Sequence, residues 1–359
     1  MHVPRLPFFD HMAFPYGSGR SVFRFPQRPG QLWILFAIAC GAFFVFGMAS
    51  SALAGKVLVV QSYHMGFAWD AGYMRGLTSV LEPEHEVRYF ELDTKRLPET
   101  EFAAQAERAL AIFHEWKPDL VVLADDNANK LLARTLLPTG VPIVYLGLNG
   151  NPRDYGLYGH EHVAGLMERP LLLPSVHMAR KVYPQTLRRL LFLFDASLTS
   201  SRIAESTFEG KESLALGGIR ADLKLVKTME EWMNAVRGAA GTYDMVILGL
   251  YQRLYDATGT TVVDDEEVLA RTMREMPVPS LALWDYSVGR GRVPAGMVHV
   301  GAYQGRVAGE IAQRMLAGER GVSIPLSVED GVFMFSRFEA RRQGLVIPPE
   351  LEVNALIME

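Results

Sequence analysis

The sequence contains a single cysteine, Cys40, which lies inside an apolar run near the N-terminus. The chain after that run therefore cannot form a disulfide or a thiolate metal site. Two histidines, His160 and His162, lie two residues apart and could supply half of a metal site, but no third ligand of suitable spacing accompanies them. We expect no metal ion and no other cofactor.

Signatures of enzymes are also missing. The sequence has no G-x-S-x-G elbow, no phosphate-binding P-loop and no H-E-x-x-H motif. A hydrolase would need a nucleophile beside a base, and no histidine is evidently set next to a serine at a strand end. The net charge of −4 is mild and no basic stripe is visible, which argues against a nucleic-acid partner. We therefore predict a protein that is not an enzyme.

The N-terminus does carry a recognisable pattern. Arginines precede an apolar run from Leu32 to Met48, and small residues follow, ending in Ala52-Leu53-Ala54. This order is typical of a secretory signal. The 18 residues from Leu32 through Ala49 also reach the lower limit for crossing a bilayer. An uncleaved membrane anchor is therefore the alternative interpretation of this segment. We predict that residues 1–54 are a signal peptide and that the protein is periplasmic or otherwise extracytoplasmic.

The rest of the chain alternates short apolar runs with amphipathic segments. The runs resemble strands buried on both faces of a parallel sheet, and the alternation begins again near residue 162. This predicts an α/β protein with two doubly wound parallel-sheet lobes. The predicted strands are 56–61, 87–92, 120–124, 142–147, 162–167, 189–194, 222–226, 245–249, 280–284 and 297–300, and the predicted helices are 68–81, 99–116, 128–137, 171–183, 200–216, 229–239 and 264–276.

The loops that follow the predicted strands carry rings, carboxylates, amides and hydroxyls. Ligands of α/β proteins bind at this end of the strands, and such groups hold a small polar organic molecule. Asp126 and Asn127 could instead cap the helix near Ala128, and Trp69 could pack between helix and sheet. Asp285 could accept an ammonium group or fix the hinge. The candidate ligand-binding residues are Ser62, Tyr63, Trp69, Asp126, Asn127, Asn149, Ser197, Tyr251, Gln252 and Asp285.

Several segments, taken in order, resemble a known family. Ser62-Tyr63-His64, then Trp69 and Gly76, and later Trp284–Gly289 and Gly301–Arg306 are similar to the ABC-transporter substrate-binding proteins of the tryptophan/tyrosine-binding type. The resemblance covers nearly all of the chain after the signal. Further matching segments are 92–96, 119–126, 142–149, 316–319 and 324–325.

The resemblance implies a type I periplasmic-binding-protein fold whose two lobes are joined by a three-segment hinge. It implies one lobe from 55–167 plus about 299–323, and a second from 168–298 plus about 324–359. Such a protein captures a small ligand by hinge closure and delivers it to an ABC permease. An amino-acid-like ligand is favoured here, with a sugar as the alternative ligand. We expect the protein to be a monomer. The alternative is a sensing module that acts on a separate membrane kinase or cyclase.

Overall fold

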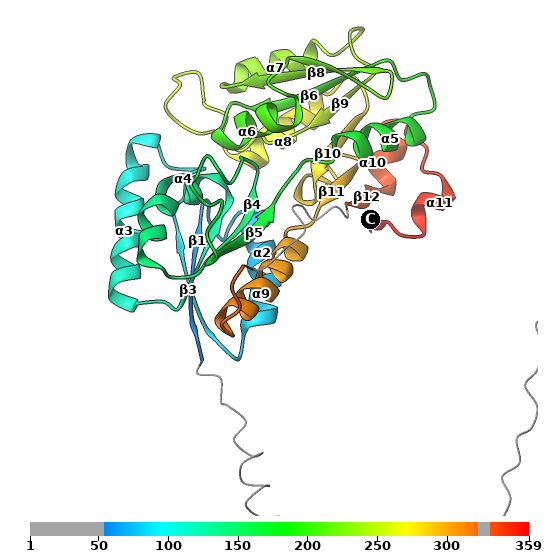
Figure 1. Cartoon of the computed structure of the whole chain (residues 1–359). Helices are drawn as coiled ribbons and strands as arrows, with labels where there is room; N and C mark the ends of the chain where they lie inside the picture. The colour runs from blue at the N-terminus through cyan, green and yellow to red at the C-terminus, as the bar shows by residue number, and fades with distance from the viewer. Residues whose placement is uncertain (1–53, 322–330, 359) are drawn as a thin grey trace, which may run out of the picture. The chain divides into compact units, whose positions relative to one another are not determined.

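The computed structural model describes residues 54–321 and 331–358 (Figure 1). The predicted signal peptide and Cys40 therefore lie outside the described residues, apart from Ala54. The described residues belong to one compact unit. Within the described ranges, no helix combines the length and the apolar character needed to cross a membrane.

The first lobe is built on a five-stranded parallel sheet with the strand order β2-β1-β3-β4-β5. Its strands are β1 (Lys56–Gln61), β2 (Glu86–Glu91), β3 (Leu120–Ala124), β4 (Ile143–Leu148) and β5 (Val163–Met167). The helices that pack with it are α2 (Ala68–Leu81), α3 (Phe102–Trp116, preceded by the 3-10 turn η1, Glu99–Glu101), α4 (Asp125–Leu136, followed by η2, Leu137–Thr139) and α9 (Gly301–Leu316).

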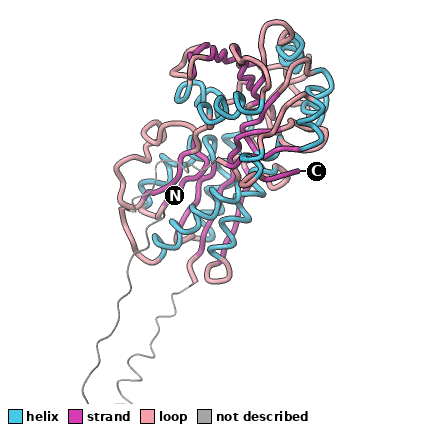
Figure 2. Tube along the Cα trace, turned by 90° about the vertical axis from the view of Figure 1, so that its right-hand side faces the viewer, coloured by secondary structure: helices cyan, strands magenta, loops and turns pink. Residues whose placement is uncertain are grey.

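Alternate residues of β1 explain why helices cover both faces of this sheet. Val57 and Val59 belong to the apolar cluster that includes α2 and α9. Leu58 and Val60 belong to a second cluster with α3 and α4. Since successive side chains of a strand point to opposite faces, an uninterrupted apolar run needs cover on both. Figures 1 and 2 show helices on both sides of the strands.

Helices α2 and α9 come from distant parts of the chain and pack side by side (Figure 1). Glycines make this close approach possible. A Cβ atom at Gly76 would overlap the carbonyl group of Ala302 and lie 2.7 Å from the backbone nitrogen of Arg306. A Cβ atom at Gly305 would lie 2.6 Å from the carbonyl carbon of Tyr73. The two backbones therefore touch where larger residues would hold them apart.

The second lobe is built on an eight-stranded sheet with the order β13-β12-β11-β10-β9-β6-β8-β7. It is mostly parallel, with antiparallel pairs at β7–β8 and β11–β12. Helices α5 and α6 pack on one face of the central strands, and α7 and α8 on the other. The elements are α5 (Leu172–Val182), β6 (Arg189–Asp195), α6 (Leu198–Thr207), β7 (Ser213–Leu216), β8 (Ile219–Val226), α7 (Met229–Arg237), β9 (Met245–Leu248), α8 (Asp265–Glu275), β10 (Ser280–Trp284), η3 (Asp285–Ser287), β11 (Ala295–His299), β12 (Val332–Ser336), α10 (Arg337–Arg342), α11 (Pro349–Glu352) and β13 (Leu356–Met358).

The predicted helix over 200–216 is wrong in its second half. Helix α6 ends at Thr207, and Ser213–Leu216 forms β7, which pairs antiparallel with β8. Gly217 and Gly218 both have positive φ angles, 56° and 82°, and connect Leu216 to its partner Ile219. Two glycines with positive φ are the preferred link of a two-residue hairpin. The helix predicted to begin at Ala128 also begins earlier, at Asp125.

The chain passes between the two sheets more than once. It leaves the first sheet after β5, and it leaves the second after β11 to form α9, which packs on α2. Strands β12 and β13 then belong to the eight-stranded sheet. Residues 322–330 lie outside the described residues. The residue boundaries of the two lobes stay a prediction.

Candidate ligand-binding site

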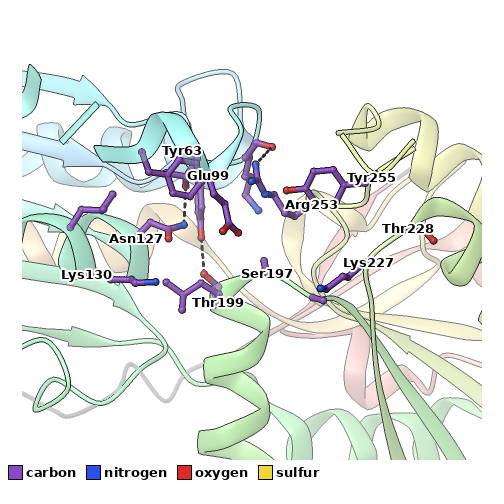
Figure 3. Close-up of a pocket in the computed structure, with 17 residues that line it drawn as sticks. Tyr63, Glu99, Asn127, Lys130, Ser197, Thr199, Lys227, Thr228, Arg253 and Tyr255 are labelled. Carbon is purple, nitrogen blue, oxygen red and sulfur yellow. Dashed lines mark hydrogen bonds between the residues drawn. The ribbon is translucent and has the colours of Figure 1, made fainter. Parts of the chain in front are cut away.

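A cavity of about 360 Å3 is lined by residues of both lobes (Figure 3). Tyr63 and Asn127 contribute from the first lobe, at the ends of β1 and β3. From the second lobe, Ser197 and Thr199 contribute at the start of α6, and Arg253 from the loop after β9. The cavity is at the small end of the usual range for ligand sites.

Tyr63 and Lys95 form the part of the wall where the lobes meet. The hydroxyl oxygen of Tyr63 lies 3.1 Å from Oγ1 of Thr199, across the gap between the lobes. The ammonium group of Lys95 lies 4.3 Å from the centre of the Tyr63 ring and 4.5 Å from that of Phe67. These are cation–π distances. Burial lowers the pKa of Lys95, and the carboxylates of Asp195 and Asp125 act in the opposite direction.

Arg253 joins its own lobe to the loop that follows β2. Its Nη1 donates hydrogen bonds to the carbonyl oxygens of Leu97, at 2.6 Å, and Lys95, at 3.2 Å. Its guanidinium carbon lies 5.4 Å from the ring centres of both Phe102 and Tyr255. The side chain is therefore held between two rings and two carbonyl groups of the cavity wall.

Three of the predicted ligand-binding residues, Tyr63, Asn127 and Ser197, line this cavity. Asn127 donates a 2.9 Å hydrogen bond to Oγ1 of Thr94, and Ser197 caps the N-terminus of α6. A fourth, Gln252, lines a neighbouring cavity of about 630 Å3. Its Oε1 lies 3.4 Å from Nζ of Lys95, which lines both cavities.

Three more predicted residues of the first lobe lie in its interior, where their polar atoms hold the strand-end loops together. Ser62 donates to the carbonyl oxygen of Ala124 at 2.6 Å and accepts from the backbone nitrogen of Ala128 at 2.8 Å. Trp69 donates to Oδ1 of Asp125 at 3.1 Å.

Asp126 is the third of these, and it organises the loop after β4. Its carboxylate accepts hydrogen bonds from the backbone nitrogens of Asn149, at 3.3 Å, and Gly150, at 2.8 Å. It also accepts one from the hydroxyl group of Tyr155, at 2.8 Å. The side chain is fully buried and does not line either cavity.

The remaining predicted residues of the second lobe also lie away from both cavities. The hydroxyl oxygen of Tyr251 is 3.3 Å from Oγ of Ser287, and its ring packs on Trp232. The carboxylate of Asp285 accepts a 2.8 Å hydrogen bond from the backbone nitrogen of Tyr286. Burial raises the pKa of Asp285 to about 6.

Asn149, the last predicted residue, belongs to a buried group at the first connection between the lobes. Its Nδ2 donates to Oε2 of Glu168 at 3.1 Å, and Nε1 of Trp284 donates to Oε1 of the same carboxyl group at 2.6 Å. Burial raises the pKa of Glu168 to about 7, although both hydrogen bonds oppose the shift. Asp126 raises this pKa further and Arg169 lowers it.

The Glu168 carboxyl group should make stability depend on pH. The pKa of this group is about 7 in the folded protein, whereas its ordinary value, which applies to the unfolded chain, is 4.5. Between these values the folded state binds more protons than the unfolded state, so stability falls as the pH rises. The stability of the wild type relative to Glu168→Gln should decrease by about 3 kcal/mol from pH 4.5 to 7.5. Urea unfolding of both proteins measures this, and a difference that stays constant with pH would contradict it.

Sequence reasoning did not select Lys95, Thr199 or Arg253 as site residues. Lys95 lies within one of the segments that resemble the family, and Arg253 directly follows Gln252, which was selected. Thr199 lies in the first turn of a helix after a strand end. The position of Thr199 after a strand could therefore have indicated it as a site residue. The places of Lys95 and Arg253 in the cavity wall depend on contacts between the lobes, which the sequence does not show.

Comparison with known proteins identifies the fold. No protein-family model and no curated protein sequence matches the chain. Among solved structures, the ABC domain from Streptococcus pneumonia in complex with L-Trp has a TM-score of 0.65 at 16% identity, covering 85% of this chain and 100% of that chain.

Two other neighbours show how widely the fold is used. A ligand-free, open substrate-binding protein with adhesive properties from Clostridium difficile has a TM-score of 0.59 at 14% identity, covering 85% of this chain and 99% of that chain. A LacI transcriptional regulator from Lactobacillus brevis has a TM-score of 0.53 at 12% identity, covering 76% of this chain and 98% of that chain. The chain therefore has the type I periplasmic-binding-protein fold with two α/β lobes, which confirms the predicted fold class.

Proposed function

We propose that this protein is an extracytoplasmic solute-binding protein that captures a small polar organic ligand between its lobes and delivers it to an ABC permease. The observation that carries the proposal is the cavity lined from both lobes, with Tyr63 and Thr199 in contact across it. A ligand held there touches both lobes at once. It therefore stabilises the closed arrangement by its additional contacts, which is how hinge closure is coupled to binding.

The structural neighbours support this proposal. One was solved with L-Trp and another is described as a substrate-binding protein. We further propose that Tyr63, Asn127 and Ser197 contact the ligand, because they are the predicted residues that line the cavity. The buried residues Ser62, Asp126 and Asn149 would then act by fixing the loops that carry those contacts. The secretory pattern before residue 55 agrees with a place outside the cytoplasm.

Thermal unfolding of the purified full-length chain against a panel of amino acids, sugars, purines and carboxylates tests the proposal. A ligand at a hundred times its dissociation constant should stabilise the folded state by about 2.7 kcal/mol. The compound should be recovered chemically unchanged. If no compound in any class shifts the unfolding temperature, the proposed small-molecule role is wrong.

One side chain allows a sharper version of this test. Asn127→Ala should weaken the binding of any active compound at least tenfold, because a hydrogen-bonding group of the wall is lost. Asn234→Ala, on the exposed face of α7, is the matched control and should bind normally. Isothermal titration calorimetry of the three proteins measures the difference. Equal affinities would place the ligand away from Asn127.

A further inference from the structure

The charges around the cavity are strongly uneven. Four of its described lining residues are cationic: Lys95, Lys130, Lys227 and Arg253. The only carboxylate in the described lining is that of Glu99, which is exposed. Lys95 and Arg253 are each 7% exposed, whereas Lys130 and Lys227 are exposed. Two cations are thus buried in the wall and two lie nearer to solvent, an arrangement that attracts a negatively charged molecule.

Arg253 has hydrogen-bonding capacity left for such a molecule. Its Nη1 is used by two carbonyl oxygens, but its Nη2 is buried and has no hydrogen-bond partner among the described residues. A buried charged donor without a partner is costly. Because Arg253 lines the cavity, an oxygen atom of a bound ligand can satisfy this nitrogen.

The start of α6 lies beside this arginine. Residues 196–199 line the cavity, and Ser197 caps this ten-residue helix. One carboxylate joins the two features: Asp195 accepts hydrogen bonds from the backbone nitrogens of Arg253, at 3.0 Å, and Ser197, at 3.1 Å. It also accepts one from Oγ of Ser200 at 2.7 Å, so three donors balance its charge. A helix N-terminus carries a partial positive charge that favours anions.

Resting on the proposed function, we propose that the ligand is a small organic oxyanion, a carboxylate or a phosphate ester that carries no ammonium group. Its oxyanion lies between the Arg253 guanidinium and the N-terminus of α6. The rings of Tyr63, Phe102 and Tyr255 line the same cavity and contact the organic part. Lys130 and Lys227, which are exposed, attract the anion towards its entrance.

An amino acid fits this cavity less well, because its ammonium group would meet cations. The carboxylates of Asp126 and Asp285 do not line the cavity. The neighbouring cavity does include Asp264 and Asp265, but Lys95 and Arg96 line it as well, and Asp264 is used as the cap of α8. The structure thus moves the sequence-based preference from an amino-acid-like ligand to an anion.

The test uses anionic, ammonium-bearing and neutral compounds, titrated into the purified full-length chain. The anionic probes are 3-phenylpropionate, succinate, phenyl phosphate and inorganic phosphate, which separate a carboxylate from a phosphate. L-Phenylalanine adds an ammonium group to 3-phenylpropionate, 2-phenylethylamine keeps only the ammonium group, and glucose is neutral. At least one organic anion should bind, and at least tenfold more tightly than the ammonium compounds. Its affinity should fall as the NaCl concentration rises.

Two variants test the placement of the anion. Arg253→Gln should weaken binding of that anion at least tenfold. Lys130→Gln changes an exposed residue and should preserve the fold while weakening binding a few-fold, whereas Lys181→Gln, on the exposed face of α5, should bind like the wild type. Equal anion binding by wild type, Arg253→Gln and Lys130→Gln would overturn the proposal. Binding of L-phenylalanine or glucose without any organic anion would overturn it but leave the proposed function standing, and no binding at all would overturn both.

Discussion

Gly76→Ala is expected to lower the free energy of unfolding by about 3 kcal/mol or more. The new methyl group would overlap the backbone of Ala302 and approach that of Arg306 to 2.7 Å. Backbone atoms in the middle of a helix cannot rotate away as a side chain can, so α2 and α9 would have to separate. Overpacking of this kind typically costs about 1–3 kcal/mol, and here it disturbs a whole helix pair.

Gly72→Ala is the matched control, one turn earlier on the same helix. A Cβ atom there would meet its nearest neighbours in α9, at Ala302 and Gly301, at an ordinary contact distance of 3.5 Å. Alanine is a better helix former than glycine by about 1 kcal/mol, so this variant should be neutral or slightly more stable. Urea unfolding of both variants gives the comparison. Similar losses in the two would show that the close contact at Gly76 is not the cause.

Asp126→Ala is expected to cost about 3 kcal/mol as well, for a different reason. Removing the carboxylate leaves the buried donors of Asn149, Gly150 and Tyr155 without their acceptor. Each unsatisfied buried donor costs about 1–3 kcal/mol, partly offset because burial already disfavours the carboxylate and raises its pKa. The loop after β4 should loosen with the loss of these bonds.

Asp154→Ala is the control for this variant, because its carboxylate belongs to the same loop but is 49% exposed. It lies 3.7 Å from the guanidinium group of Arg202, and an exposed pair of this kind contributes at most about 1 kcal/mol. Chemical unfolding separates the two variants. If Asp126→Ala keeps full stability but loses ligand binding, Asp126 contacts the ligand, as the sequence analysis proposed.

Local patterns were sufficient to predict the central elements. The apolar run 56–61 and the helical spacing of 68–81 give the observed bounds of β1 and α2. The residues that form each pattern are the ones that pack into the core, so the local pattern and the tertiary structure agree. The prediction of one helix over 200–216 failed because the helical start is followed by Ser213–Leu216, a short strand at the edge of the sheet. The two glycines at 217 and 218 mark the hairpin, and they outweigh the preceding periodicity.

The candidate site could be predicted only in part. Tyr63, Asn127 and Ser197 directly follow strands or begin helices, so their place at one edge of a sheet can be inferred from the alternation of elements. The place of Arg253 depends on carbonyl oxygens at residues 95 and 97, more than 150 positions earlier in the chain. No local pattern encodes such a contact, because it forms only when the two lobes meet.

Under the proposed transport role, the Nη2 of Arg253 affects how often the protein closes without a ligand. The contact of Arg253 with Leu97 buries a guanidinium group, and its Nη2 then has no partner within the described chain. If this costs the ligand-free protein about 2 kcal/mol in its closed arrangement, the population of that arrangement falls about thirtyfold. An anion at that nitrogen removes the penalty. Under the proposed transport role, the closed arrangement would therefore belong mainly to protein that holds its ligand.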